Sequence, residues 1–124
     1  MSPSVTAVET AGINLVILVG EVTSPVVSRT LASGDTASTF DLATVTEAGR
    51  VSVPVSVMGE CDLATVGAEL CVVGYVRRRF FRSGAGVTSR TEVVAESVVP
   101  MRRRVQARKI ATRALENLSE FLDT

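Results

Sequence analysis

The stretch "LCVVGYVRRRFFRSGAGVTSRTEVVAESVV", residues 70–99, decides the fold of this chain. Segments 70–81 and 88–99 are rich in valine, and they flank a short link, "RSGAG", that carries two glycines. Two β-branched segments separated by such a link are typical of antiparallel strands joined by a hairpin. Four arginines surround two phenylalanines at the same place, so this hairpin is also the first candidate for a functional surface.

Three more segments of the chain have the composition of strands. They are residues 13–22, 38–45 and 50–59, which are rich in β-branched and other apolar residues. Segments 24–38 and 61–69 are expected to be connections, the second with a single helical turn at most. Five strands with one short helical piece between the third and fourth predict an all-β domain, a five-stranded barrel of the oligonucleotide/oligosaccharide-binding type (OB-fold). A five-stranded sandwich is the main alternative.

Two of these strands carry a feature that limits their place in the barrel. Residues 13–22 are apolar on both faces, which predicts that one face covers the core and the other meets a second subunit. Pro54 has no N–H to donate to a neighbouring strand. The strand at 50–59 should therefore lie at an edge or contain a bulge.

The composition divides the chain into three parts. Residues 1–12 are expected to be a flexible lead-in, 13–100 the OB-fold domain and 101–124 a C-terminal helical segment. Apolar residues at helical spacing predict a helix from about Val105 to Leu122. Its early cations and late acids oppose the helix dipole. Packing on the barrel, or against a neighbour's helix, must therefore hold it in place.

Several classes of function are excluded by the residues that are few or missing. With two cysteines, Cys61 and Cys71, and no histidine, the chain lacks a disulfide scaffold, a closed zinc site and His-based catalysis. We expect no enzyme, no metal and no cofactor. Each cysteine is expected to be buried as a small apolar residue, with a disulfide between subunits as the minor alternative. No signal peptide or membrane span is apparent, which predicts a cytoplasmic protein.

A net charge of zero conceals a strong asymmetry along the chain. Residues 1–76 hold two arginines against eight acids, a balance of −6. Residues 77–113 hold ten arginines and one lysine against two acids, a balance of +9, and residues 114–124 carry three acids and no cation. Such a concentration of positive charge is typical of a surface that meets a polyanion, although a solvated arginine surface would give the same pattern.

Alternation along strand 70–81 sorts its side chains onto two faces. Val72, Gly74 and Val76 should face the barrel interior, and Phe80 is expected to cap the barrel. The opposite, outward face should carry Tyr75, Arg77, Arg79 and Phe81. Aromatic rings interspersed with cations are what single-stranded nucleic acid requires, because bases stack on rings while arginines hold phosphates.

Three stretches taken together resemble bacterial single-stranded DNA-binding proteins. They are "NLVILVGEVTSPVVSRTLASGDTASTFDLAT" (14–44), "VSVPVSVMG" (51–59) and "GYVRRRFFRSGAGVTSRTEVVAESV" (74–98). The shared pattern is an Asn and an apolar strand ending in Gly, a Pro-containing loop, Leu-Ala-Thr, and a basic strand with an aromatic before a Gly hairpin and Thr-Glu-Val-Val. The resemblance implies an OB-fold, a homo-oligomer (usually a tetramer) and sequence-independent binding of single-stranded DNA in replication, recombination or repair.

The resemblance also implies roles for individual residues. Phe81 occupies the position of a stacking aromatic residue in the family. Arg77 and Arg79 occupy positions of basic residues in the same strand, and Arg29 matches the basic residue of the first loop. Phe40 is more often core than a stacking ring. The complete candidate nucleic-acid-binding set is Arg29, Phe40, Tyr75, Arg77, Arg79, Phe81, Arg82 and Arg90.

Two departures from the family pattern leave a second function open. Ser52 and Met58 stand where the third strand of the family usually offers aromatics. The acidic tail tip that ends in Phe is also missing, because "SEFLDT" (119–124) follows the predicted helix directly, which leaves open the recruitment of replication and repair proteins. The chain resembles a divergent or secondary member, and the alternative function is an OB-fold assembly or adaptor protein with weak or no DNA binding.

Overall fold

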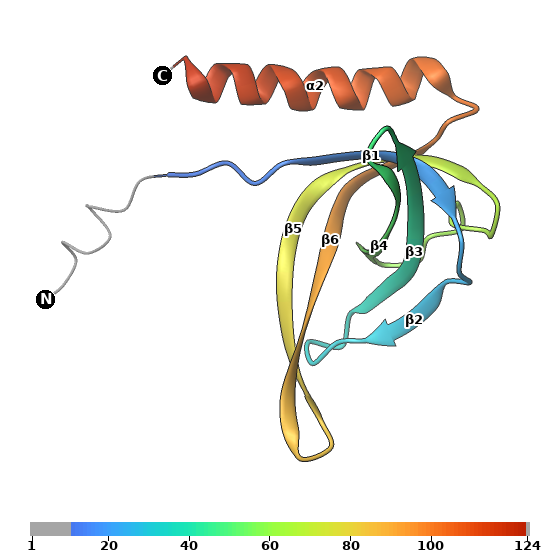
Figure 1. Cartoon of the computed structure of the whole chain (residues 1–124), viewed down its shortest axis with the longest axis vertical. Coiled ribbons are helices and arrows are strands. Elements are labelled where there is room, and N and C mark those ends of the chain that lie inside the picture. Colours follow the sequence, from blue (N-terminus) through green and yellow to red (C-terminus); the bar gives the residue numbers. More distant parts are fainter. Residues whose placement is uncertain (1–10, 124) are drawn as a thin grey trace, which may run out of the picture.

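Six strands and one helix make up residues 11–123, the part of the chain that this computed structural model describes (Figure 1). The expected flexible lead-in, 1–12, therefore lies almost wholly outside the described residues. The elements are β1 (Val16–Val22), β2 (Val27–Thr30), β3 (Thr36–Thr46), β4 (Gly49–Met58), β5 (Glu69–Ser83), β6 (Gly86–Pro100) and α2 (Arg104–Leu122).

The strands close into a barrel. Their order is β1-β5-β6-β4-β3-β2, and a further pairing of β1 with β3, Glu21 opposite Ala43 and Val22 opposite Leu42, joins the two sides. A Cβ on Gly20 would lie 2.3 Å from the carbonyl oxygen of Ala43, so only glycine fits at this seam. The structure is a closed five-stranded barrel with one extra strand and a C-terminal helix, which confirms the predicted OB-fold barrel over the sandwich.

Two connections differ from the sequence-based prediction. Strand β2 lies inside the expected loop 24–38 and pairs with the start of β3, from Val27 opposite Thr39 to Thr30 opposite Thr36. Its sequence, "VSRT", is largely exposed, so it shows no apolar alternation by which to recognise a strand. Segment 61–68 forms two turns in place of the single helical turn, and Glu69 already begins β5.

The barrel core is built from side chains of all five barrel strands. Its largest fully buried members are Phe40, Leu42, Leu70, Val22, Val55 and Val72. The expectation that the strand at 50–59 lies at an edge or contains a bulge is wrong, because β4 lies between β3 and β6 and its register with β3 is unbroken. Pro54 is tolerated because the residues of β4 that pair with β6, Val55–Val57, begin just after it. Two predicted interior positions are wrong, because Val76 and Phe80 are 43% and 66% exposed. Both lie beyond Gly74, the last residue of β5 that pairs with β1, so β5 has a neighbouring strand on one side only at these positions.

Strands β5 and β6, of 15 residues each, project from the barrel as a long two-stranded ribbon (Figure 1). A register shift divides the pair, since Val73 lies opposite Ser97 while Gly74 lies opposite Ala95. Glu96 is therefore the extra residue of a β-bulge, which changes the face on which every β6 residue before it points. A Cβ on Gly74 would lie 1.9 Å from the carbonyl oxygen of Val94, so the bulge requires glycine there.

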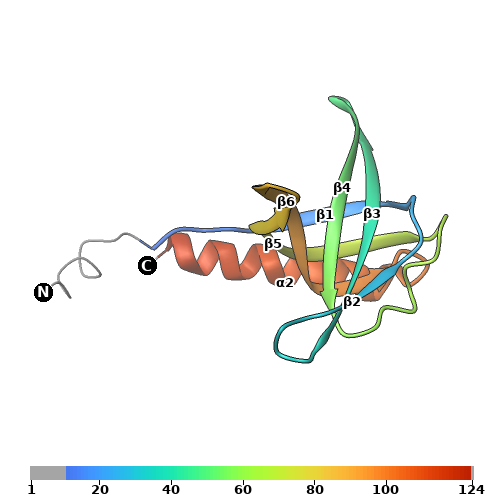
Figure 2. The ribbon, with the colours of Figure 1, turned by 90° about the horizontal axis from the view of Figure 1, so that it is seen from below.

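Helix α2 lies on the outer face of the barrel and, in Figure 2, runs along β5 while β3 and β4 cross in front of it. Ala107 and Ala114 are its buried residues. Ala107 packs with Cys71 and Val99 of the strands beneath, and Ile110 packs against this cluster. The predicted helix, with bounds of about 105–122, is confirmed. Packing on the barrel, one of the two contacts expected to hold it in place, is what the structure shows.

Candidate nucleic-acid interface

Arg77 and Arg79 of β5 point outward to the same side of the ribbon. Both approach one carboxylate oxygen, Oε2 of Glu92 in β6, with Nη2 of Arg77 at 2.5 Å and Nε of Arg79 at 3.7 Å. Glu92 is directly opposite Arg77 in the β5–β6 register, and directly opposed residues share a face. The predicted shared outward face of the two arginines is therefore present.

Glu92 was not among the predicted site residues. Its side chain is fully buried, and among the described residues its Oε1 has no hydrogen-bond partner. A buried carboxylate is costly unless cations and donors compensate it, so the two guanidinium groups stabilise its charge, and it fixes their positions in return. Alternation along 88–99 could not reveal this contact, because the bulge at Glu96 decides which β6 residue faces Arg77.

Phe81 continues the same face two residues further along β5. The guanidinium carbon of Arg79 lies 5.2 Å from the centroid of its ring, within the range of a cation–π contact. The residue keeps 37% of its surface exposed. Phe81 is therefore a surface ring held by an arginine, and it can offer an open area to a flat ligand.

A groove of about 400 Å³ lies between the base of the ribbon and strands β2, β3 and β4. Buried Ala37 and Ser56 contribute to its lining. Met58, 58% exposed, stands at this groove where the family pattern has an aromatic. Four arginines also line it: Arg29, Arg77, Arg78 and Arg79. Nε of Arg29 is buried without a hydrogen-bond partner among the described residues, so the groove is a basic cleft with an apolar floor.

Three other predicted site residues, Arg90, Tyr75 and Arg82, lie in different surroundings. Arg90 lies opposite Arg79 and forms an ion pair of 3.8 Å with Asp41 of β3. Tyr75 is half-buried on the same face of β5. Arg82 is exposed and does not line the groove, and alternation places it on the opposite face from Arg79.

Phe40 does not belong to the interface. It is 2% exposed and lies in the barrel core with Leu42 and Val55. No face of its ring is open to a base, so the inclusion of Phe40 among the nucleic-acid-binding residues is wrong. Its alternation in β3 explains the result, because Phe40 and Leu42 point inward while Asp41 between them points outward to Arg90.

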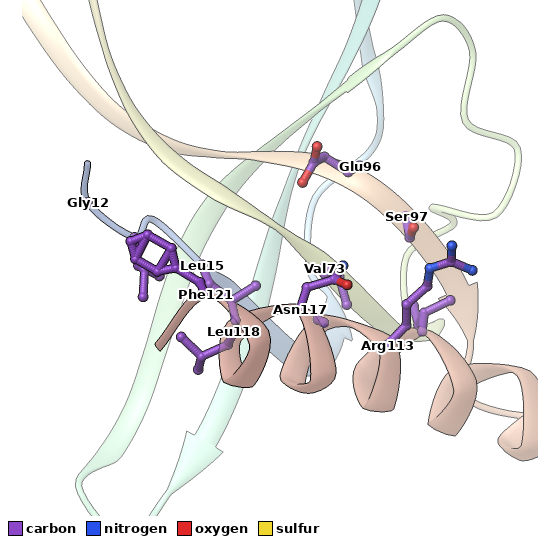
Figure 3. Close-up of a pocket in the computed structure, with 12 residues that line it drawn as sticks. Gly12, Leu15, Val73, Glu96, Ser97, Arg113, Asn117, Leu118 and Phe121 are labelled. Atoms are coloured by element: carbon purple, nitrogen blue, oxygen red, sulfur yellow. The ribbon is translucent and has the colours of Figure 1, made fainter. Parts of the chain in front are cut away.

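A second hollow, of about 460 Å³, lies between α2 and the strands. Figure 3 shows apolar Leu15, Leu118 and Phe121 at one end, and polar Arg113 and Ser97 near the other. It shares no lining residue with the groove at the ribbon. The hollow is therefore a separate, mainly apolar feature.

Two properties of the described residues bear on other kinds of function. Within residues 11–123 no group of three or more His, Cys, Asp or Glu side chains is placed to hold a metal ion. Over the same range, no helix combines the length and the apolar character that crossing a bilayer requires.

Comparisons with known proteins agree with the fold. Neither a protein-family model nor a curated protein matches the sequence. Among solved structures, the chain is similar to the Plasmodium falciparum SSB in its complex with ssDNA. The two share 19% sequence identity and superpose with a TM-score of 0.59, over 74% of this chain and 97% of that one. At this identity the similarity shows the fold, and it agrees with the resemblance to single-stranded DNA-binding proteins in sequence.

Proposed function

We propose that this protein binds single-stranded DNA along the outward face of β5 and β6 and through the adjoining groove. The observation that carries the proposal is the alignment of Arg77, Arg79 and Phe81 on one face of an OB barrel, with the two arginines held beside a single buried carboxylate. The similarity in fold to an SSB that was solved in complex with ssDNA supports it.

Binding at such a surface is independent of base sequence. The ring of Phe81 can stack on any base, and guanidinium groups contact phosphates, which are the same at every nucleotide. This mode suits a protein that coats and protects single-stranded DNA during replication, recombination or repair and catalyses no reaction. The cytoplasm, in association with the nucleoid, is the corresponding location.

The proposal includes a homo-oligomer, with a tetramer as the expected form. Exposed apolar side chains lie on and beside the outer face of β1, where Ile13 and Val19 are 46% and 45% exposed. On α2, Leu115 is 54% exposed. Apolar side chains gathered on a surface favour contact with another subunit, and the two apolar faces of β1 led to the same expectation from the sequence.

Titration with labelled oligo-dT at two salt concentrations tests the proposed binding. The logarithm of the affinity should fall with the logarithm of salt concentration by about 0.7 for each phosphate contacted. A duplex of matched length is the control and should bind more weakly, because paired bases cannot stack on Phe81. Equal affinity for duplex and single strand, or no binding at low salt, would contradict the proposal.

An OB-fold adaptor that binds proteins and not DNA is the second candidate. It is favoured by a specific observation, which is that Glu92 and Asp41 already pair with three arginines of this face. The same titration decides between the candidates, since an adaptor would leave oligo-dT unbound at low salt. Light scattering with and without oligo-dT then reports the oligomeric state in each case.

A further inference from the structure

The ribbon of β5 and β6 has a second face, which the proposed interface reaches only where the groove begins. We define this rear face by residues that alternation and register place together: Arg78, Phe80 and Arg82 of β5, with Val87 and Ser89 opposite them on β6. We propose that the rear face is a second contact surface for the same single-stranded DNA, with Phe80 as its stacking ring. This inference rests on the proposed function.

The exposure of Phe80 is the first observation that supports the rear face. Its 66% exposure makes it the more open of the two rings on the ribbon, compared with 37% for Phe81. Arg78 and Arg82 precede and follow it by two residues, so a guanidinium group lies on each side of the ring along the strand. The rear face therefore repeats the combination of ring and arginines that the front face presents.

The charge balance separates the two faces. On the front face, Glu92 pairs with Arg77 and Arg79, and Asp41 pairs with Arg90. Arg78 and Arg82 form no ion pair with any residue between 11 and 123, and the sequence from 76 to 91 contains no acid. Unlike Arg77, Arg79 and Arg90 of the front face, the two rear arginines therefore carry a charge that no acid of the described chain offsets. A phosphate backbone complements such a charge.

The two faces are continuous around one edge of the ribbon. Arg78 and Phe80 are themselves part of the lining of the groove that Arg77 and Arg79 line. A DNA strand in this groove therefore already lies beside Phe80. A single DNA strand that occupies the groove and then the rear face is the occupant that this arrangement favours.

Oligo-dT of two lengths tests the rear face. The shorter oligomer has about 4 nucleotides, the smallest site of an OB-fold, and the longer one has about 16, the largest. We expect Phe80→Ala to weaken binding of the longer oligomer by about 5- to 150-fold, the effect of losing one stacked base. Binding of the shorter oligomer should weaken less, because Phe80 contributes only to the lining of the groove there. Phe81→Ala should weaken both. Val45→Ala, which removes a side chain 68% exposed at the end of β3, is the matched control and should change neither.

The arginines provide a second, independent readout. Arg78→Ala and Arg82→Ala should each reduce the salt dependence for the longer oligomer by about 0.7 in the logarithmic slope. The rear face is refuted, while the proposed function stands, if the wild-type protein binds oligo-dT and only Phe81→Ala, not Phe80→Ala, weakens that binding. If the wild-type protein binds neither oligomer, both fail. A fall in molecular mass of free Phe80→Ala in light scattering would show that the ring meets a second copy of the chain, which also refutes the inference.

Discussion

Nη2 of Arg77 lies 2.5 Å from Oε2 of Glu92, whose side chain is fully buried. Both residues lie on the face that we propose for DNA, so the protein carries a negative charge beneath its own phosphate-binding arginines. The carboxylate fixes the position of Arg77 but also offsets part of its attraction for a polyanion. The same residue is therefore expected to affect stability and binding in opposite directions.

Glu92→Gln tests this double role. Gln keeps the size of the side chain but removes the charge that balances two guanidinium groups, so the free energy of unfolding should fall by about 1.5–3 kcal/mol. Affinity for oligo-dT at low salt should rise, and its salt dependence should become steeper, because Arg77 becomes available to a phosphate. Glu96→Gln, which removes an exposed acid from the same strand, is the control. Weaker DNA binding by a folded Glu92→Gln protein would contradict the opposing effects.

Gly74→Ala tests the bulge that brings Glu92 to Arg77. The added methyl group would lie 1.9 Å from the carbonyl oxygen of Val94, so the backbone must move, and overpacking of this kind costs about 1–3 kcal/mol or more. Chemical denaturation should show the loss. Gly86→Ala, where an added methyl group would meet no atom within 4 Å, should be close to neutral. Equal stability of the two variants would contradict the packing described for the bulge.

Much of the fold could be predicted from the sequence because its strands are long and rich in β-branched residues. The outward arrangement of Arg77, Arg79 and Phe81 followed from alternation alone, since strand β5 runs without interruption through all three. Alternation does not say where a barrel ends. Val76 and Phe80 were therefore assigned to the interior, although the pairing of β5 with β1 ends at Gly74, before either residue is reached.

The features that could not be predicted depend on contacts between strands. Strand β2 is short and mostly exposed, so only its pairing with β3 identifies it. Glu92 faces Arg77 because one extra β6 residue, Glu96, enters the register. The sequence shows the Thr-Glu-Val-Val motif that contains Glu92, but nothing in the motif tells which residue lies across from it.

Cys71 makes the stability of the protein sensitive to alkaline pH. Burial under α2 raises the pKa of its thiol above the ordinary value. An unfolded thiol ionises near a pKa of about 8.5, so above that pH the unfolded chain loses a proton that the folded chain keeps. The contribution is fully present at lower pH, and the free energy of unfolding should decline as the pH rises beyond about 8.5.

Denaturant titrations of the wild-type protein and Cys71→Ala over this pH range measure the effect. Other groups also titrate there, so the difference between the two proteins is the relevant quantity. The wild-type protein should lose more stability than Cys71→Ala as the pH rises. Parallel declines would show that the thiol ionises equally in the folded and unfolded chains.

The affinity of Phe81→Ala for oligo-dT, measured beside its thermal unfolding, is the most direct test of the proposed interface. The stacking contribution of one ring predicts a loss of about 5- to 150-fold in affinity with little change in stability, because Phe81 is a surface residue. Phe40→Ala should instead mainly affect stability, because removing this core ring should lower the free energy of unfolding by about 3–5 kcal/mol. A folded Phe81→Ala protein that binds oligo-dT as tightly as the wild type would contradict the proposal that this ring and its arginines form the DNA-binding face.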